Sequence, residues 1–295
     1  MKYFSTFSGI GGFELGIKKV YDSEKISATC IGYSEIDKYA IQVYNKQFNH
    51  KNYGDITKII ASELPDFDLL VGGFPCQSFS IAGRRKGFED TRGTLFFDLA
   101  RILQAKKPNN FVFENVKGLL NHDKGNTFAT ILTTITELGY DCQWQVLNSK
   151  NFGVPQNRER VFIVGHIRGT SRPEVFPIGN SSKAVDKTKE LPEQISNTLR
   201  TNYSNAHSNE TYILADKQDT QERGDKSDNS NSIRRASYTD DMRIRRLTPT
   251  ECCRLQGFPD NWVDGISDTQ KYKCLGNAVT TNVITAIGKR LLSFS

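Results

Sequence analysis

The chain has 295 residues, of which 37% are hydrophobic, and a formal net charge of +6. This length suits one large and one smaller domain, and the composition is that of a globular protein, which excludes fibrous and disordered chains. The first residues hold too short an apolar run for a secretory signal, and no stretch approaches the roughly 20 apolar residues that cross a membrane. We therefore expect a cytoplasmic protein with no membrane segment.

Cysteine and histidine usage argues against a metal site. The six cysteines show no Cys-x-x-Cys spacing and only four histidines are present, so we expect reduced thiols and no bound metal. The positive charge is compatible with a polyanion such as nucleic acid, but many soluble proteins reach the same value.

The first predicted elements are a strand over residues 2–7, a glycine-rich turn and a helix. The turn reads Phe7-Ser8-Gly9-Ile10-Gly11-Gly12-Phe13, and such a turn lets backbone amides approach a ligand closely. A second strand over residues 26–34 ends at Glu35, at about the 20-residue spacing at which an acidic side chain reaches a ribose hydroxyl. A glycine turn alone can be only a tight turn, but the two features together predict a nucleoside cofactor.

The next polar turn is Gly54-Asp55-Ile56-Thr57. It is a place where a strand can end. The alternative is that Asp55 caps the helix that follows.

An apolar run over residues 67–71 predicts a buried parallel strand, and Gly72-Gly73-Phe74-Pro75-Cys76-Gln77-Ser78 follows it. Cys76 should therefore emerge at the carboxyl edge of the sheet, where open α/β sheets bind ligands. Most lone cysteines are small buried hydrophobes. We favour a nucleophile, because the glycines and Pro75 hold the side chain at a set angle and polar residues follow it directly.

The segment after this cysteine, residues 81–92, carries four basic side chains between glycines. Such a loop can close over a phosphate backbone, and the alternative is a solvated charge run. Residues 94–103 then read as an amphipathic helix that packs on the core.

A further buried strand, residues 111–116, contains Glu114 close to its end. A salt bridge to Lys117 is one interpretation. However, the carboxyl ends of parallel strands meet at one edge, so Glu114 should lie in the same crevice as Cys76 and Glu35. This convergence is the main sequence argument for an active site.

A helix over residues 127–138 and an extended stretch over 141–147 precede the segment Pro155-Gln156-Asn157-Arg158-Glu159-Arg160. A strand over residues 161–165 follows. Because alternate side chains of an extended segment share a face, Arg158 and Arg160 should point one way and Glu159 the other. A solvated strand edge is the alternative.

The composition becomes polar from Gly169, and residues 216–232 contain too little apolar surface to pack, so we expect that piece to be mobile. Order returns at Thr248-Pro249-Thr250-Glu251, a capping box that opens a helix closed by Gly257. A last helix is predicted from Tyr272 onward, with apolar residues at positions 279, 283, 287 and 291 facing a core.

These motifs resemble the cytosine-5 DNA methyltransferase family of bacterial or phage type, as found in restriction-modification systems. The resemblance rests on Pro-Cys-Gln at a strand exit, the glycine turn with Glu35, Pro-Gln-x-Arg-x-Arg, and the Leu-Thr-Pro-Thr-Glu block with Gln-Gly-Phe-Pro, and it covers residues 1–167 and 245–290 in the family's order. It implies a doubly wound, Rossmann-like α/β domain that binds S-adenosylmethionine (residues 1–168), a small target-recognition domain (169–270) and a C-terminal helix packed back on the first domain (271–295).

The resemblance also implies roles for single residues. The catalytic set would be Cys76, Glu114, Arg158 and Arg160. The cofactor-binding set would be Phe7, Ser8, Gly9, Ile10, Gly11, Gly12, Phe13, Glu35, Ile36, Asp55, Ile56, Pro75, Leu95, Asn277, Ala278 and Val279. The DNA-binding set would be Gln77, Ser80, Arg84, Arg85, Arg92 and Thr198. The chain departs from the family at Ser5, where an acid is frequent, and at Ile36, where an aromatic is frequent.

We therefore expect an enzyme that methylates C5 of cytosine in a specific double-stranded DNA sequence, acts as a monomer and has a restriction endonuclease as a possible partner. One alternative is a tRNA cytosine-5 methyltransferase, which Gln77-Ser78 disfavours. Another is a catalytically silent DNA-binding relative, which the complete catalytic set disfavours.

Overall fold

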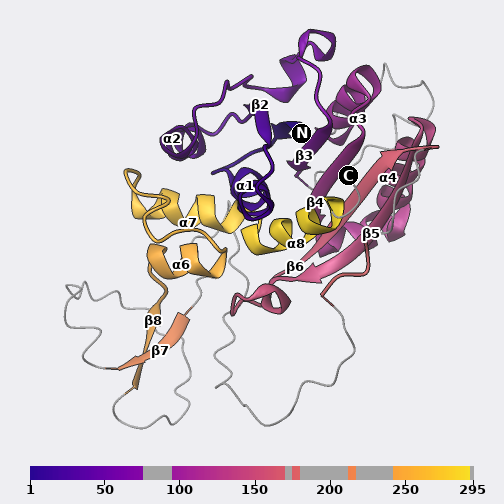
Figure 1. Cartoon of the computed structure of the whole chain (residues 1–295). Coiled ribbons are helices and arrows are strands. Elements are labelled where there is room, and N and C mark those ends of the chain that lie inside the picture. The colour runs from indigo at the N-terminus through magenta and orange to yellow at the C-terminus, as the bar shows by residue number, and fades with distance from the viewer. Residues whose placement is uncertain (76–94, 170–174, 180–211, 217–241, 293–295) are drawn as a thin grey trace.

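The computed structural model describes residues 1–75, 95–169, 175–179, 212–216 and 242–292 (Figure 1). Cys76 and its basic loop, position 198 and all of residues 216–232 except Asp216 lie outside these ranges. Within the described part of the chain, no helix has both the length and the apolar character needed to cross a membrane.

The centre of the molecule is a six-stranded sheet with strand order β2-β1-β3-β4-β6-β5. Neighbouring strands among the first four are parallel, whereas β6 runs antiparallel to both β4 and β5. The strand bounds are β1 Lys2–Thr6, β2 Thr29–Ser34, β3 Leu69–Gly73, β4 Asn110–Val116, β5 Tyr140–Asn148 and β6 Glu159–Ile167. The predicted second strand starts three residues later than expected, and Ile26 before it is half exposed.

Helices cover both faces of the sheet, as expected for a doubly wound fold. Because side chains alternate along a strand, Phe4 and Leu70 point into a cluster with α3 and α4, while Tyr3 and Val71 point into a second cluster with α1 and α8. Figure 1 shows α1 and α8 side by side. The helix bounds are α1 Gly12–Glu24, α2 Lys38–Gln47, α3 Leu95–Lys106, α4 Asn126–Glu137, α6 Pro249–Leu255, α7 Asp268–Asn277 and α8 Thr281–Leu292.

The helix α6 begins with the predicted capping box. Thr248 accepts a hydrogen bond from the backbone N–H of Glu251, and the Glu251 carboxylate accepts one from the N–H of Thr248. Gly257 follows the helix with φ 75°. Arg245, at the end of the two-stranded ladder β7 (Tyr212–Asp216) and β8 (Met242–Arg246), donates two hydrogen bonds to Glu251 at 2.9 and 2.7 Å.

A third core cluster joins the two ends of the chain. Ile10 and Leu15 of the first domain pack with Leu247, Phe258 and other apolar residues up to α7. Part of the expected recognition domain (169–270) thus packs with residues of the expected first domain, and the bounds of a recognition domain stay a prediction.

The last predicted helix is two helices in the structure. The first of them begins at Asp268, so the expected start at Tyr272 is wrong. Helix α7 ends at Asn277, Ala278 is extended with ψ 146°, and α8 begins at Thr281. Val279 thus lies in the linker, where its side chain packs on Gly12. Of the four predicted apolar positions, 283 and 287 are buried on α8 and 291 is partly buried there.

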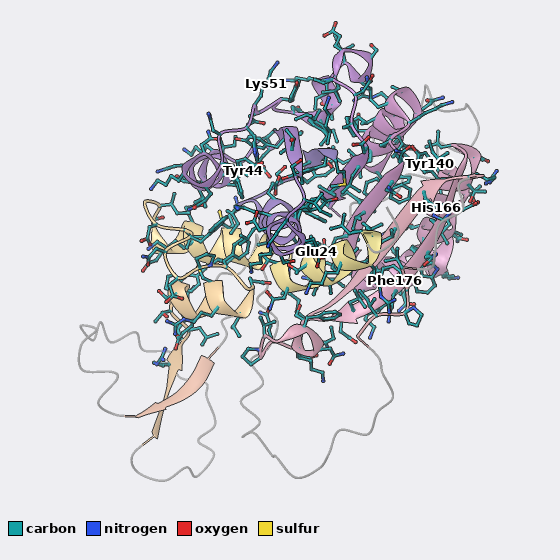
Figure 2. All side chains as sticks on the ribbon, viewed as in Figure 1. Glu24, Tyr44, Lys51, Tyr140, His166 and Phe176 are labelled. Carbon is teal, nitrogen blue, oxygen red and sulfur yellow. The ribbon has the colours of Figure 1, made fainter. Side chains whose placement is uncertain are left out.

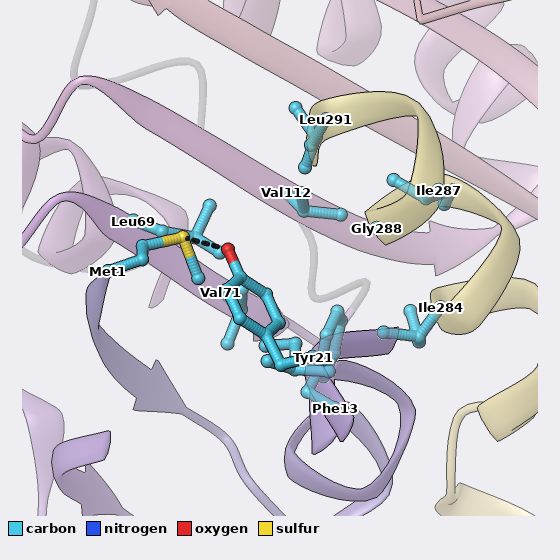
Figure 3. Close-up of a pocket in the computed structure, with 11 residues that line it drawn as sticks. Met1, Phe13, Tyr21, Leu69, Val71, Val112, Ile284, Ile287, Gly288 and Leu291 are labelled. Carbon is cyan, nitrogen blue, oxygen red and sulfur yellow. Dashed lines mark hydrogen bonds between the residues drawn. The ribbon is translucent and has the colours of Figure 1, made fainter. Parts of the chain in front are cut away.

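A small apolar cavity lies between α1, α8 and strands β3 and β4 (Figure 3). Its volume is about 30 Å³, and its lining is almost wholly apolar, apart from the Tyr21 hydroxyl, which donates to the Met1 sulfur at 2.9 Å. Ligand sites need placed polar groups to fix orientation. The cavity is therefore a packing gap in the core.

Candidate active site

The glycine turn has the close-packed backbone that its sequence predicts. Phe7, Gly9 and Gly11 have positive φ of 51°, 55° and 87°. A Cβ on Gly11 would lie 2.5 Å from the Phe48 ring, and one on Gly12 would lie 2.8 Å from Val279. Glycine is required at both positions, because neither neighbour is the flexible end of a long side chain. A Cβ on Gly9 would meet nothing within 4 Å, so its backbone faces open space.

Glu35 is bonded directly to this turn. Its Oε2 accepts a hydrogen bond from the Gly9 N–H at 2.8 Å, and its Oε1 accepts from the N–H groups of Ile36 and Asp37, each at 2.8 Å. These bonds hold a partly exposed carboxylate against the glycine turn at the end of β2. The adjacent Ile36 is 71% exposed.

Asp55 caps a short 3-10 helix, η1 (Ile56–Lys58). Its Oδ1 accepts hydrogen bonds from the Thr57 hydroxyl and backbone N–H, and these bonds lower the Asp55 pKa. The Ser34 hydroxyl donates to the Gly54 carbonyl at 2.6 Å, which links this turn to the end of β2. The capping alternative is thus realised, and Ile56 is buried.

The end of β3 is anchored just before Cys76. Phe74 is buried and Pro75 is exposed, and the Asn115 amide donates a hydrogen bond to the Phe74 carbonyl at 2.8 Å. Cys76 itself lies outside the described residues. So do Gln77, Ser80, Arg84, Arg85, Arg92 and Thr198.

Glu114 and Arg160 form an ion pair beside this exit. The Arg160 Nε lies 3.1 Å from Glu114 Oε1, and their side chains are only 16% and 13% exposed. Glu114 is paired in register with Gly73, and a Cβ on Gly73 would lie 3.1 Å from Glu114 Oε2. Lys117, the alternative partner for Glu114, instead bonds Glu159 at 2.8 Å.

The direction of β6 explains how Arg160 reaches this place. Because β6 is antiparallel to β4, its first residues lie at the edge where β4 ends, and Arg160 is in register with Val116. Arg160 pairs with Glu114, whereas the adjacent Glu159 pairs with Lys117. Neighbouring side chains of an extended chain are expected to reach different partners in this way.

Arg158 is buried in the interior rather than exposed at the site. Its side chain is 2% exposed and one terminal nitrogen donates to the Ala278 carbonyl at 2.9 Å. Burial, and then the charge of Arg160, lower the Arg158 pKa to about 9, whereas the charge of Glu114 raises it, so the guanidinium stays charged at neutral pH. Arg158 therefore ties β6 to the linker between α7 and α8.

The remaining predicted cofactor residues differ in what they expose. Ala278 and Val279 are buried in the linker and Ile10 and Phe13 are buried in core clusters, so these residues offer mainly backbone atoms to a ligand. Others have some side-chain exposure: Phe7, Leu95 and Asn277.

Trp262 is a residue of the site that sequence reasoning missed. Its indole Nε1 donates a buried hydrogen bond to the Ile10 carbonyl at 2.8 Å, within the glycine turn. A tryptophan in the core needs a partner for its N–H, which is the general signal. No spacing in the sequence indicates that the partner lies at the other end of the chain.

Comparisons with known proteins decide the family. The family model described as C-5 cytosine-specific DNA methylase matches residues 1–233 and 180–293. This chain belongs to the C-5 cytosine-specific DNA methylase family.

Relatives within that family match almost the whole chain. Type II methyltransferase M1.ScrFI of Lactococcus lactis subsp. cremoris is 39% identical over 99% of this chain and 78% of its own length. M.SsoII of Shigella sonnei is 41% identical over 97% and 79%, and M.NlaX of Neisseria lactamica is 41% identical over 98% and 96%.

Solved structures of methyltransferases share the fold of this family member. Entamoeba histolytica EhMeth aligns with TM-score 0.70 at 17% identity, covering 99% of this chain and 98% of that one. A DNA modification methyltransferase described as putative, from an Escherichia coli prophage, aligns with TM-score 0.63 at 18% identity over 100% and 99%. This likeness confirms the Rossmann-like methyltransferase fold.

Replacing Glu35 by Ala should weaken binding of S-adenosylmethionine, the methyl donor general to methyltransferases of this kind. The change removes a charged acceptor and frees the Gly9 N–H that it holds. Losing hydrogen bonds to a charged group costs about 1.5–3 kcal/mol, so we expect Kd by calorimetry to rise roughly 10- to 150-fold. Glu24→Ala, on the exposed end of α1, is the control. An unchanged Kd for Glu35→Ala would remove this carboxylate from the cofactor site.

Proposed function

We propose that this protein transfers a methyl group from S-adenosylmethionine to C5 of a cytosine within a specific double-stranded DNA sequence, as a DNA (cytosine-5-)-methyltransferase. The observation that carries the proposal is the partly buried Glu114–Arg160 pair at the end of β4, beside the anchored strand exit that leads into Cys76. The glycine turn with Glu35 at the neighbouring strand ends supports a cofactor at the same edge of the sheet.

The chemistry requires groups of the kinds that meet here. C5 of cytosine is a weak nucleophile. When the Cys76 thiolate adds to C6, the ring becomes an enamine with electron density at C5. Glu114 as an acid supplies a proton at N3, where negative charge develops, and Arg160 stabilises the charge at O2. S-adenosylmethionine supplies the methyl group when bound. Loss of the C5 proton to water then restores the double bond and expels the thiolate, and the N3 proton returns to Glu114.

Residues around the glycine turn would hold the cofactor. The closely packed backbone of Gly9 to Gly12 leaves room for a ligand over Gly9, and Glu35 presents a carboxylate beside it. We assign the ribose hydroxyls to Glu35 and the adenine to Asp55 and Ile56. The linker Ala278–Val279, which packs on Gly12, would close the other side.

Arg158 would act as a positioning residue in this reaction. It is held by the Ala278 carbonyl and lies close enough to Arg160 and Glu114 for their charges to affect its pKa. A buried cation in this place fixes the strand start that presents Arg160. It would also couple that strand to the linker at the cofactor.

DNA must present the cytosine outside the duplex, because a stacked base cannot enter such a site. We assign DNA contacts to Gln77, Ser80, Arg84, Arg85, Arg92 and Thr198. The relatives named Type II methyltransferases make a cognate restriction endonuclease a reasonable partner. We further propose a cytoplasmic, monomeric enzyme.

Bisulfite sequencing of DNA from cells that express the protein tests this function. We expect methylated cytosines at one recurring sequence, and none with Cys76→Ala. Bisulfite conversion of RNA from the same cells addresses the tRNA alternative. Methylation in RNA alone would support that alternative, and methylation in neither, with the protein still binding DNA, would support the silent relative.

A further inference from the structure

Glu14 carries a fully buried carboxyl group, two residues after Gly12 of the glycine turn. It lies in the first turn of α1, and its side chain is 0% exposed. Its Oε1 accepts a hydrogen bond from the Tyr44 hydroxyl at 3.0 Å, while its buried Oε2 has no hydrogen-bond partner. Tyr44 belongs to α2, as Figure 2 shows. Acidic side chains are rarely fully buried without a partner for each oxygen, so this one needs an explanation.

A chain of hydroxyl groups connects Glu14 with the glycine turn. Ser8 in the turn donates to Ser5 of β1 at 2.8 Å. The Tyr44 hydroxyl donates to the Glu14 carboxyl, and the hydroxyls of Ser5 and Ser8 lie close enough to it to lower its pKa. Ser8 directly precedes Gly9, whose backbone faces open space. A change of charge at Glu14 therefore acts on Ser8, the residue next to Gly9 of the proposed cofactor site.

Burial raises the pKa of the Glu14 carboxyl to about 7, and the nearby hydroxyls of Ser5, Tyr44 and Ser8 and its own backbone lower it in part. Near neutral pH the group is thus partly protonated. A charge placed nearby can shift this balance.

The thiol and phenol groups around Glu14 keep their protons near neutral pH. Burial, with a smaller contribution from the charge of Glu14, raises the pKa of Cys30 to about 12 and those of Tyr3 and Tyr44 well above their ordinary values. The pKa of Tyr33 is raised to about 12 by burial and then by the charges of Glu35 and Glu14. His50, which bonds the Tyr44 hydroxyl at 2.9 Å, has a pKa lowered by burial.

We propose that Glu14 is a positioning residue that gives up its proton when a cationic cofactor occupies the glycine turn. This inference rests on the proposed function. S-adenosylmethionine carries a sulfonium charge, whereas the product S-adenosylhomocysteine has a neutral sulfur. A buried carboxylate behind the turn attracts the cation and not the neutral sulfur, and the attraction is strong where water is excluded.

Two consequences follow from this coupling. Binding of S-adenosylmethionine favours the charged form of Glu14 and releases protons, by up to about half a proton per site when the pH equals the pKa. By the same linkage, the preference for substrate over product increases as pH rises through 7. Glu14 thus helps the enzyme to release the spent cofactor.

Calorimetric titration in two buffers of different ionisation enthalpy measures the protons released at pH 7. Each ligand is titrated into the wild type, Glu14→Gln and Glu24→Gln. The control Glu24 lies on the same helix and is exposed. The difference between wild type and Glu14→Gln cancels any proton that the ligand itself exchanges. We expect that difference to be a few tenths of a proton for S-adenosylmethionine and close to zero for S-adenosylhomocysteine, with Glu24→Gln behaving as wild type.

Equal proton release by the wild type and Glu14→Gln, with both binding S-adenosylmethionine, would overturn the inference. So would an equal difference for the two ligands. Failure of the folded wild type to bind either ligand would contradict the proposed function instead. If Glu14→Gln does not fold, Tyr44→Phe decides. Because the Tyr44 hydroxyl lowers the Glu14 pKa, its loss should move the maximum of proton release to higher pH, and an unmoved maximum contradicts the inference.

Discussion

Replacing Glu114 by Gln will lower the rate of methyl transfer about 10²- to 10⁴-fold, the range expected when a general acid is lost. The amide keeps the volume of the side chain and an oxygen that Arg160 can bond, so the fold and the place of Arg160 are preserved. The amide cannot deliver a proton to N3. The loss should therefore appear in kcat for labelled methyl transfer, while the Kd for S-adenosylmethionine stays within about twofold, because Glu35 rather than Glu114 is bonded to the glycine turn.

A neighbouring acid provides the matched control. Glu159 directly precedes Arg160 but bonds Lys117 on the opposite side of the strand, and its side chain is 43% exposed. Glu159→Gln should leave the rate unchanged. Full activity in Glu114→Gln, or an equal loss in both variants, would remove the proton-donor role from Glu114.

Local sequence patterns could predict which residues end the strands. Apolar runs followed by glycine or an acid predicted β3 and β4, and the ends of parallel strands must share an edge. These patterns placed Glu35 just after β2 and Glu114 near the end of β4, where the structure has them. The partner of Glu114 could not be found, because it depends on the direction of β6. The register that brings Arg160 to the end of β4 joins segments far apart in the chain, and no local pattern encodes it.

The linker between α7 and α8 is a second case in which tertiary contacts decide the structure and local sequence patterns do not. The spacing of residues 279, 283, 287 and 291 fits one helix, yet tertiary contacts interrupt it. Arg158 binds the Ala278 carbonyl, and the Thr281 N–H donates to the Gln256 carbonyl instead of continuing a helix from α7. Val279 is thereby placed on Gly12. Helical periodicity is a local signal, and the tertiary contacts of Ala278, Val279 and Thr281 override it.

The largest effect is expected from DNA that carries 5-fluorocytosine at the target position. If the Cys76 sulfur adds to C6 and the methyl group arrives at C5, release requires that the C5 hydrogen leave as a proton before the thiolate departs. Fluorine cannot leave as a cation. The reaction should therefore stop with enzyme and DNA joined through sulfur, in a complex that survives denaturing electrophoresis. It should require S-adenosylmethionine, form slowly in Glu114→Gln and be absent in Cys76→Ser.

Peptide mapping of this adduct distinguishes Cys76 from the other thiols. Burial raises the pKa of Cys30, Cys252 and Cys274 to about 12, that of Cys253 to about 11, and that of Cys142 above its ordinary value. Since the thiolate is the nucleophile, none of these five should react at neutral pH. The modified residue should lie within residues 71–84. An adduct on any of the five, or no adduct with a verified target sequence, would contradict the covalent mechanism even in a protein that methylates DNA.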